Sequence, residues 1–258
     1  MRQYLAALVL CFVIPASHAT AVSGRGTWET TLQPRDFDGN TATIEGYYDT
    51  ALGITWLNPL TTGAPTDWTN AQLVLGNVNV NGIGGWRLPI VRPIDGTTAD
   101  DLVYSASGSE DYGYNVSAPG TLYAGSTASE LAHLFFTTLG NVSQYDTANV
   151  LRPGTAGSGW GLINTGPFNV IQPSIAGRTN GIYWSQTAVA GLPNSNWAFN
   201  FYNGSQVQVL RSSSYYLWVV HDGAVGNAIN PVPVPAAAWL LLSGLAGLGF
   251  VGRRRKAS

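Results

Sequence analysis

The chain has 258 residues, of which only 10% are charged, and a single cysteine, Cys11. Residues 20–230 hold seven arginines, no lysine and all fourteen acidic residues. This charge balance argues against nucleic acid as a partner, because nucleic-acid binding depends on Lys and Arg contacts to phosphate. The same residues contain no cysteine, so they can form no disulfide, thiolate metal site or cysteine nucleophile.

The N-terminal residues 1–19 predict a secretory signal peptide. Arg2 supplies the positive start, and the apolar run that follows it is too short to span a membrane. Ser17 and Ala19 are the small residues of a cleavage site, which places cleavage between Ala19 and Thr20. We therefore expect export through the general secretion machinery.

A stretch rich in acidic residues and glycine comes before the first predicted strand, and it raises a calcium hypothesis. When Gly39 is aligned with the glycine of an EF-hand loop, Asp36, Asp38 and Glu45 fall at ligand positions. Pro34 then stands where the first aspartate is required. An acidic turn is therefore the favoured interpretation, with calcium kept as the only cofactor considered.

Short apolar stretches bounded by glycine, proline and polar residues predict the strands of the body. Their ranges are 53–57, 84–89, 181–187, 196–210 and 214–223. The dipeptide Asn203-Gly204 inside the fourth range is a strong β-hairpin signal.

Two segments predict helices. The first covers 66–77 and begins with a Thr-Asp pair, either of which can act as the N-cap. The second covers 126–141, begins with a Ser-Thr pair, carries Glu130 in its first turn and ends near Gly140. Its apolar residues share one face at helical spacing: Leu131, Leu134, Phe135 and Leu139.

Long loops rich in Gly, Ser and Asn carry most of the candidate binding residues. Exposed aromatic rings can stack on the faces of sugars while amide side chains bond the hydroxyl groups. We single out four loop tyrosines as candidate glycan contacts: Tyr104, Tyr112, Tyr114 and Tyr123. Local packing of the long loops is the alternative interpretation of the tyrosines.

Catalytic motifs do not stand out. His133 and His221 lack a neighbouring pattern such as H-E-x-x-H, and no G-x-S-x-G occurs. We expect both histidines to be structural, Trp86 and Arg87 to be a core residue and an ion-pair residue, and the chain not to be an enzyme. Trp184 and Trp197 are likewise expected in the core.

After a linker at 226–231, the chain ends in "VPVPAAAWLLLSGLAGLGFVGRRRKAS". Its apolar segment at 236–251 and the basic residues behind it would suit a membrane anchor with a cytoplasmic end. These basic residues are Arg253, Arg254, Arg255 and Lys256. The whole arrangement at 232–258 resembles the PEP-CTERM sorting signal. The residues that match its motif are Val232, Pro233, Val234, Pro235, Ala236 and Ala237, with Val234 where the name-giving form has Glu.

The PEP-CTERM resemblance implies recognition by an exosortase. The chain would enter the inner membrane of a Gram-negative, exopolysaccharide-producing bacterium transiently through its C-terminal helix. It would then be released to, or fixed on, the cell surface or extracellular matrix, for example in a biofilm. A permanent anchor is the alternative.

The body at 20–225 resembles the Lcl C-terminal domain family through pieces such as "YYDTALGITWL", "DWTNAQ", "GGWRLP", "YWSQT", "WAFNFYNG" and "YYLWVVHDG". The resemblance implies an α+β, C-type lectin-like fold, with two helices, a twisted and mainly antiparallel sheet, and long loops. A signal helix and a C-terminal hydrophobic helix would flank it. "GITWL" and "YLWVVH" would be paired strands. By the same analogy, Asn196 and Asn203, beside the hairpin, would lie where lectin-like folds often bind ligands, which adds them to the candidate glycan contacts. Formylglycine-generating enzymes share this fold, but their chemistry requires cysteines that this body lacks.

These features predict an exported surface or matrix protein whose non-enzymatic, lectin-like domain binds polysaccharide or a surface partner. One alternative is a structural surface protein that binds only protein partners or itself. Another is a glycan hydrolase, because the body contains enough acidic residues to provide a catalytic pair.

Overall fold

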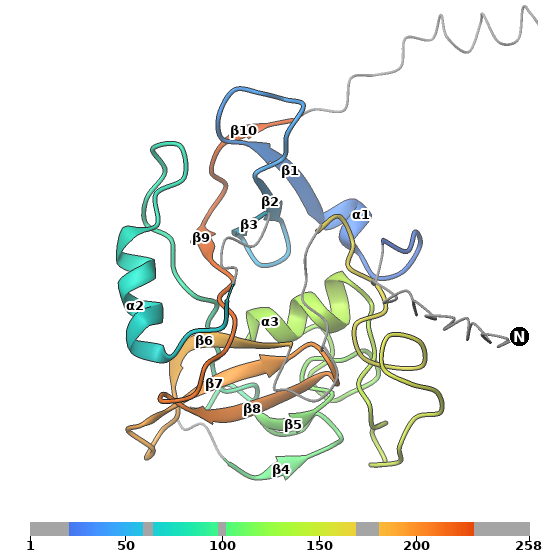
Figure 1. Ribbon diagram of the computed structural model, residues 1–258. Helices are drawn as coiled ribbons and strands as arrows, with labels where there is room; N and C mark the ends of the chain where they lie inside the picture. Colours follow the sequence, from blue (N-terminus) through green and yellow to red (C-terminus); the bar gives the residue numbers. More distant parts are fainter. Residues whose placement is uncertain (1–20, 59–63, 98–101, 169–180, 230–258) are drawn as a thin grey trace, which may run out of the picture.

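The computed structural model describes residues 21–58, 64–97, 102–168 and 181–229. The first of its two sheets has five antiparallel strands and carries both ends of the described chain (Figure 1). Its strands, in spatial order, are β10 (Asn227–Ala228), β1 (Leu32–Asp36), β2 (Gly46–Asp49), β3 (Ile54–Leu57) and β9 (Val220–Asp222).

The second sheet also has five strands, and only β4 and β5 run parallel. Its spatial order is β4 (Tyr104–Ser105), β5 (Tyr112–Tyr114), β8 (Ser205–Leu210), β7 (Ser195–Asn200) and β6 (Ile182–Ala188). The predicted α+β class with mainly antiparallel strands is confirmed. The strands divide between two sheets, whereas the sequence led us to expect one.

Helix α2 (Trp68–Asn77) confirms the first predicted helix. Its N-cap is Asp67, whose side chain accepts a hydrogen bond from the backbone N–H of Asn70. A single turn, α1 (Trp28–Thr31), comes before β1 and was not predicted. The cap assignment follows from the side-chain oxygen of Asp67, which can accept from the N–H groups left free in the first turn of a helix.

The second predicted helix is shorter than its sequence pattern. Helix α3 (Glu130–His133) is capped by Ser129 and continues directly as the π-helix η1 (Leu134–Thr138). Residues 126–128 do not join it, because the chain there is bonded to a neighbouring extended segment. Arg92 N–H donates to the Ala128 carbonyl, and a bridge pairs Val91 with Ser129. The expected N-cap at Ser126 or Thr127 is therefore wrong by about one turn.

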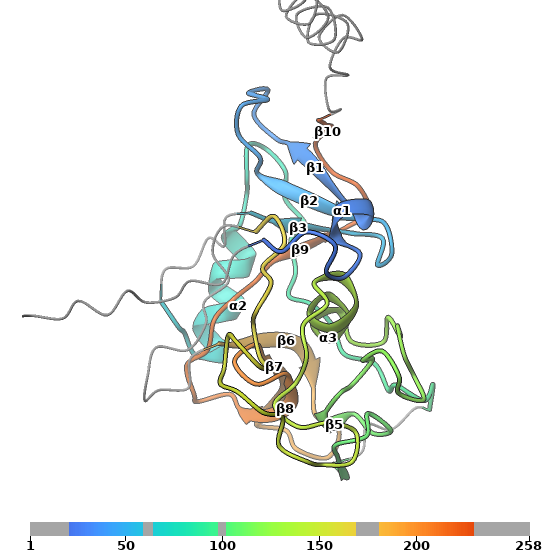
Figure 2. The same ribbon diagram turned by 90° about the vertical axis from the view of Figure 1, so that its right-hand side faces the viewer.

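The α3–η1 helix lies between the two sheets, as both views show (Figures 1 and 2). Its predicted apolar face is buried, and so are Ala132 and Phe136 on other sides. Aromatic rings of one core cluster pack on each other here: Phe135 and Phe136 of η1 contact Phe199 of β7, while Trp56 of β3 and Phe168 contact Trp218. Burial of these rings stabilises the folded domain, whereas many small exported domains are stabilised by disulfides.

Helix α2 is held by a second cluster of buried residues. Ala71 packs there with Leu57, Trp184, Leu217 and Val219. Apolar packing, with no cysteine in this part of the chain, therefore holds α2 against the segment that leads into β9.

Several strand predictions are confirmed. Residues 53–57 and 181–187 correspond to β3 and β6, and β3 pairs with β9 as "GITWL" and "YLWVVH" were expected to do. The hairpin in 196–210 is also confirmed, as β7 and β8. Its connection has four residues, however, because the strands close at Asn200 and Ser205 and Phe201 enters the core.

Two strand predictions need correction. Residues 84–89 form no strand and pair only through Arg87 with Val220, since Gly85 has φ 78° and Pro89 has no N–H to donate. In 214–223 only Val220–Asp222 join the ladder as β9, because the earlier residues cross from the second sheet, where Tyr216 bridges Tyr183, to the first. Strands β1 and β2 replace part of the expected acidic turn.

The predicted signal peptide, sorting signal and hydrophobic segment at 236–251 lie outside the described residues. Among those that are described, no helix is both long enough and apolar enough to cross a membrane.

Candidate functional site

Three candidate glycan contacts come together where β4 and β5 pair at the edge of the second sheet. Tyr104 lies opposite Tyr112. Its ring centroid is 5.9 Å from that of Tyr112 and 6.4 Å from that of Tyr114. Gly113 permits this approach, because a Cβ atom there would overlap the carbonyl oxygen of Ser105. Strand β4 therefore lays Tyr104 against the two tyrosines of β5.

A fourth ring, Tyr145, belongs to the same group and was missed in the sequence. Its centroid is 5.0 Å from that of Tyr114, and a bridge pairs it with Leu151. The Tyr104 hydroxyl donates to Asn149 Oδ1 over 3.2 Å, which ties this loop to β4. Only the presence of another tyrosine in a polar loop hinted at it. We define the tyrosine platform as Tyr104, Tyr112, Tyr114 and Tyr145.

The tyrosine platform combines exposed apolar surface with hydroxyl groups. Tyr104 is 48% exposed, and the other three rings are half-buried. Asn203 donates from Nδ2 to the Tyr114 hydroxyl over 3.2 Å, so it lies next to the tyrosine platform. Burial, then the neighbouring tyrosines, raise the pKa of Tyr114 to about 12. Exposed apolar side chains surround the rings: Leu102, Val103, Val150 and Leu151.

Two candidate contacts lie elsewhere in the structure. Tyr123 is partly buried and packs against the main core cluster. Asn196 is fully buried; its Nδ2 donates to the carbonyls of Ser185 and Gln186, and its Oδ1 accepts from Arg211 Nε. The amide of Asn196 is thus used inside the domain, so we remove this residue from the candidate contacts.

The acidic residues considered for calcium do converge. One carboxylate oxygen from each of Asp36, Asp38 and Glu45 lies within 4.8 Å of the others. Asp36 is buried, Glu45 is half-buried and Asp38 is exposed. Several of these oxygens already accept backbone N–H groups of the loop, such as Phe37 on Glu45 and Gly39 on Asp36. Carboxylate oxygens are the ligands that Ca²⁺ prefers, so the residue types fit this ion.

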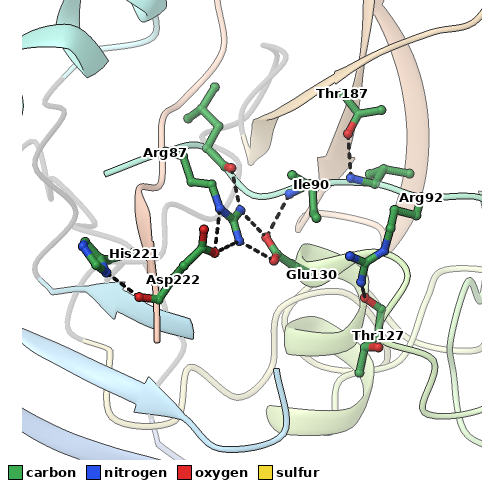
Figure 3. A network of polar contacts seen from close by, with 10 residues as sticks. Arg87, Ile90, Arg92, Thr127, Glu130, Thr187, His221 and Asp222 are labelled. Atoms are coloured by element: carbon green, nitrogen blue, oxygen red, sulfur yellow. Dashed lines mark hydrogen bonds and ion pairs between the residues drawn. The ribbon is translucent and has the colours of Figure 1, made fainter. Parts of the chain in front are cut away.

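A network of charged residues joins β9 of the first sheet to α3 (Figure 3). Arg87 binds Glu130 through two hydrogen bonds of 2.9 and 2.8 Å and Asp222 at 2.6 Å. Both ion pairs found among the described residues use Arg87, as predicted for this residue. Burial alone would lower the pKa of Arg87, but the two carboxylates outweigh it and the pKa is raised. This network is structural, since Glu130 also accepts the backbone N–H of Ile90.

A shallow cavity of about 380 Å³ lies beside this network, between Arg92–Thr97 and Ser126–Ala128. Arg92 is its only charged lining residue and donates to the Thr127 carbonyl (Figure 3). No aromatic ring lines it. The tyrosine platform is therefore the better candidate for contact with a sugar.

The remaining residues singled out in the sequence behave as core residues. Trp86, Trp184 and Trp197 are buried, and so is His133. His221 packs edge-on against Trp86 at 5.6 Å between centroids. Comparison with models of known protein families found no match, and no significant match was found among curated proteins or solved structures.

Proposed function

We propose that this chain is an exported bacterial surface or matrix protein whose non-enzymatic domain binds polysaccharide through the tyrosine platform. The lectin-like fold, the signal peptide and the exosortase-dependent sorting inferred from the sequence belong to the same proposal. The observation that carries it is the tyrosine platform itself, where four rings from three separate segments meet at an exposed sheet edge.

The physical case for a sugar ligand rests on what the tyrosine platform offers. Tyr104 presents nearly half of its surface to solvent, which is unusual for a ring that already contacts two others. Sugar rings have apolar C–H faces that stack on aromatic rings and hydroxyl edges that need donors and acceptors. Asn149 and Asn203, each bonded to a tyrosine hydroxyl, supply both.

A protein partner, or a second copy of this chain, is the second candidate. It is favoured by the exposed apolar side chains around the rings, of which Val103 and Val150 are both 58% exposed and Leu151 is 55% exposed. Contiguous exposed apolar residues commonly mark a protein interface. A rise in sedimentation coefficient with concentration, abolished by Val150→Ser, would favour this candidate.

The test of the proposal is binding of the purified full chain to an array of bacterial polysaccharides, with calcium and with a chelator. We expect saturable binding that Tyr104→Ala reduces at least about tenfold, as stacking on a lost ring would predict. Tyr104→Phe keeps the ring and should retain most of the affinity. Leu73→Ala, which truncates a 61% exposed side chain on α2, is the matched control. Absence of glycan binding by the wild-type chain would overturn the proposal.

A further inference from the structure

We propose that the tyrosine platform selects neutral polysaccharides and discriminates against polyanionic ones. This inference rests on the proposed function and concerns the class of ligand that the same surface takes. It follows from the charges and hydrogen-bonding groups that accompany the four rings.

Acidic side chains dominate the segments that build the tyrosine platform. Residues 102–114 and 142–152 contain Glu110, Asp111 and Asp146, against a single basic residue, Arg152. Glu110 and Asp146 are half-buried, so their carboxylates act through partly exposed surface. Asp146 opens the turn that carries Asn149, the partner of the Tyr104 hydroxyl, and Glu110 lies two residues before Tyr112. A uronate carboxylate placed on the rings would therefore approach like charges, and this repulsion weakens as salt is added.

Arg152 does not turn the tyrosine platform into an anion site. The side chain is half-buried, and its Nε is enclosed without a hydrogen-bond partner. The other described arginines have partners outside the tyrosine platform: the Gly140 carbonyl for Arg25, Gln33 for Arg35, two carboxylates for Arg87, the Thr127 carbonyl for Arg92 and Asn196 for Arg211. A polyanion carries a charge on each successive sugar, so one partly enclosed guanidinium cannot match it.

Neutral hydroxyl and amide groups lie in the same segments as the rings or are bonded to them. Ser105, Ser107 and Ser109 form a chain of hydroxyls with Oγ separations of 2.8 and 3.1 Å, directly behind Tyr104 in the sequence. Each hydroxyl both donates and accepts, as do the amides of Asn149 and Asn203. This set is complementary to the hydroxyl groups of an uncharged sugar.

The experiment uses matched polymers that differ only in charge. A glucan, a galactan and a mannan are each presented to the full chain as the neutral polymer and as the derivative oxidised at C6 to the carboxylate. We expect at least one neutral polymer to bind about tenfold more tightly than its carboxylate in 20 mM salt, and the ratio to shrink in 300 mM salt. The double variant Glu110→Gln/Asp146→Asn should improve binding of the carboxylate and leave the neutral polymer unchanged.

The two proposals fail in different ways. Equal or tighter binding of the carboxylate polymers, still lost in Tyr104→Ala, would overturn the selectivity and leave polysaccharide binding in place. Absence of binding to any of the six polymers would overturn both. If the Glu110→Gln/Asp146→Asn variant preferred neutral polymers as strongly as the wild type does, the inference would also be contradicted. The two carboxylates could then not be the cause of the preference.

Discussion

Arg87 and Glu130 meet side by side in the interior, with Arg87 Nη1 2.9 Å from Glu130 Oε2 and Nη2 2.8 Å from Oε1. The side chain of Glu130 is only 5% exposed, and that of Arg87 18%. One residue comes from the segment next to β9 and the other from the first turn of α3, so this contact joins the first sheet to the central helix.

Removal of Arg87 should therefore be costly. Arg87→Met leaves the Glu130 carboxylate buried without its cation, and we expect the free energy of unfolding to fall by about 3 kcal/mol. Asp222→Asn is the matched control, since its side chain is 76% exposed and the loss should stay below about 1 kcal/mol. Urea denaturation measures both. Similar losses for the two variants would contradict a dominant role of the buried pair.

A second prediction concerns Asp49, which ends β2 and is fully buried. Burial raises its pKa above the usual value of 3.8. The folded state then holds a proton that the unfolded state releases, so the stabilising contribution of Asp49 is present at low pH and is lost as the pH rises through the folded pKa. Asp49→Asn, whose Oδ1 can still accept from the Ala51 and Leu52 N–H groups, should gain stability relative to the wild type as the pH rises from about 4 to 8.

The control for this pH dependence has the opposite sign. Hydrogen bonds from Arg87 lower the pKa of Asp222, so its contribution is present above the ordinary value of 3.8 and is lost as the pH falls through the folded pKa. Asp222→Asn should thus be less stable than the wild type at neutral pH and approach it in acid. Urea titrations at several pH values would show the two trends, and parallel curves for the two variants would be inconsistent with them.

Gly113 provides a test of how the tyrosine platform is assembled. Gly113→Ala would place a Cβ against the Ser105 carbonyl at a backbone φ of +128°, which should displace β4 and cost about 2 kcal/mol. We expect glycan affinity to fall with it, because Tyr104 moves off Tyr112. Gly96→Ala has φ +76° and open space around its Cβ, so it should cost about 1 kcal/mol and keep affinity. Differential scanning calorimetry and the polysaccharide assay give the two readouts.

The three carboxylates of the β1–β2 loop predict a response to neutralisation. Asp38→Asn removes one of three like charges whose oxygens lie within 4.8 Å, and it should raise the melting temperature slightly in calcium-free buffer. The same comparison in millimolar calcium tests the calcium hypothesis. A calcium-induced rise in melting temperature that only the wild type shows would support it. An equal response of the wild type and Asp38→Asn to calcium would leave the acidic turn as the correct interpretation. A lower melting temperature for Asp38→Asn without calcium would contradict the repulsion argument.

Local patterns predicted the elements that local chemistry determines. Asp67 caps α2 because its carboxylate can reach the nearby N–H of Asn70, and the β7–β8 hairpin forms around a strong turn dipeptide. Features that depend on contacts between distant segments, such as the start of α3, could not be predicted from the sequence. Ser129 replaces Ser126 as the helix cap because residues 126–128 are bonded to a strand-like segment some 35 residues earlier.

The candidate site follows the same rule. Tyr104, Tyr112 and Tyr114 could be singled out from composition, but Tyr145 joins them only through the fold. Asn196 looks like Asn203 in the sequence, and only its buried bonds to Ser185 and Gln186 separate the two. Strand β1 was not predicted, because Pro34 lies in the middle of it and has no backbone N–H to donate. The strand can form because its neighbour β10 pairs with only two of its residues and so needs few N–H donors from it.

Strand β10 pairs with Arg35 and Asp36 of β1 and is the last described element of the chain. Figure 1 places it at the opposite end of the domain from β4, which carries Tyr104. Figure 2 shows the same separation of β10 from β5. If the chain after β10 attaches the domain to a surface, the tyrosine platform lies at the end of the domain that points away from that surface. Two domains attached to one surface in this way would both present their tyrosine platforms outward.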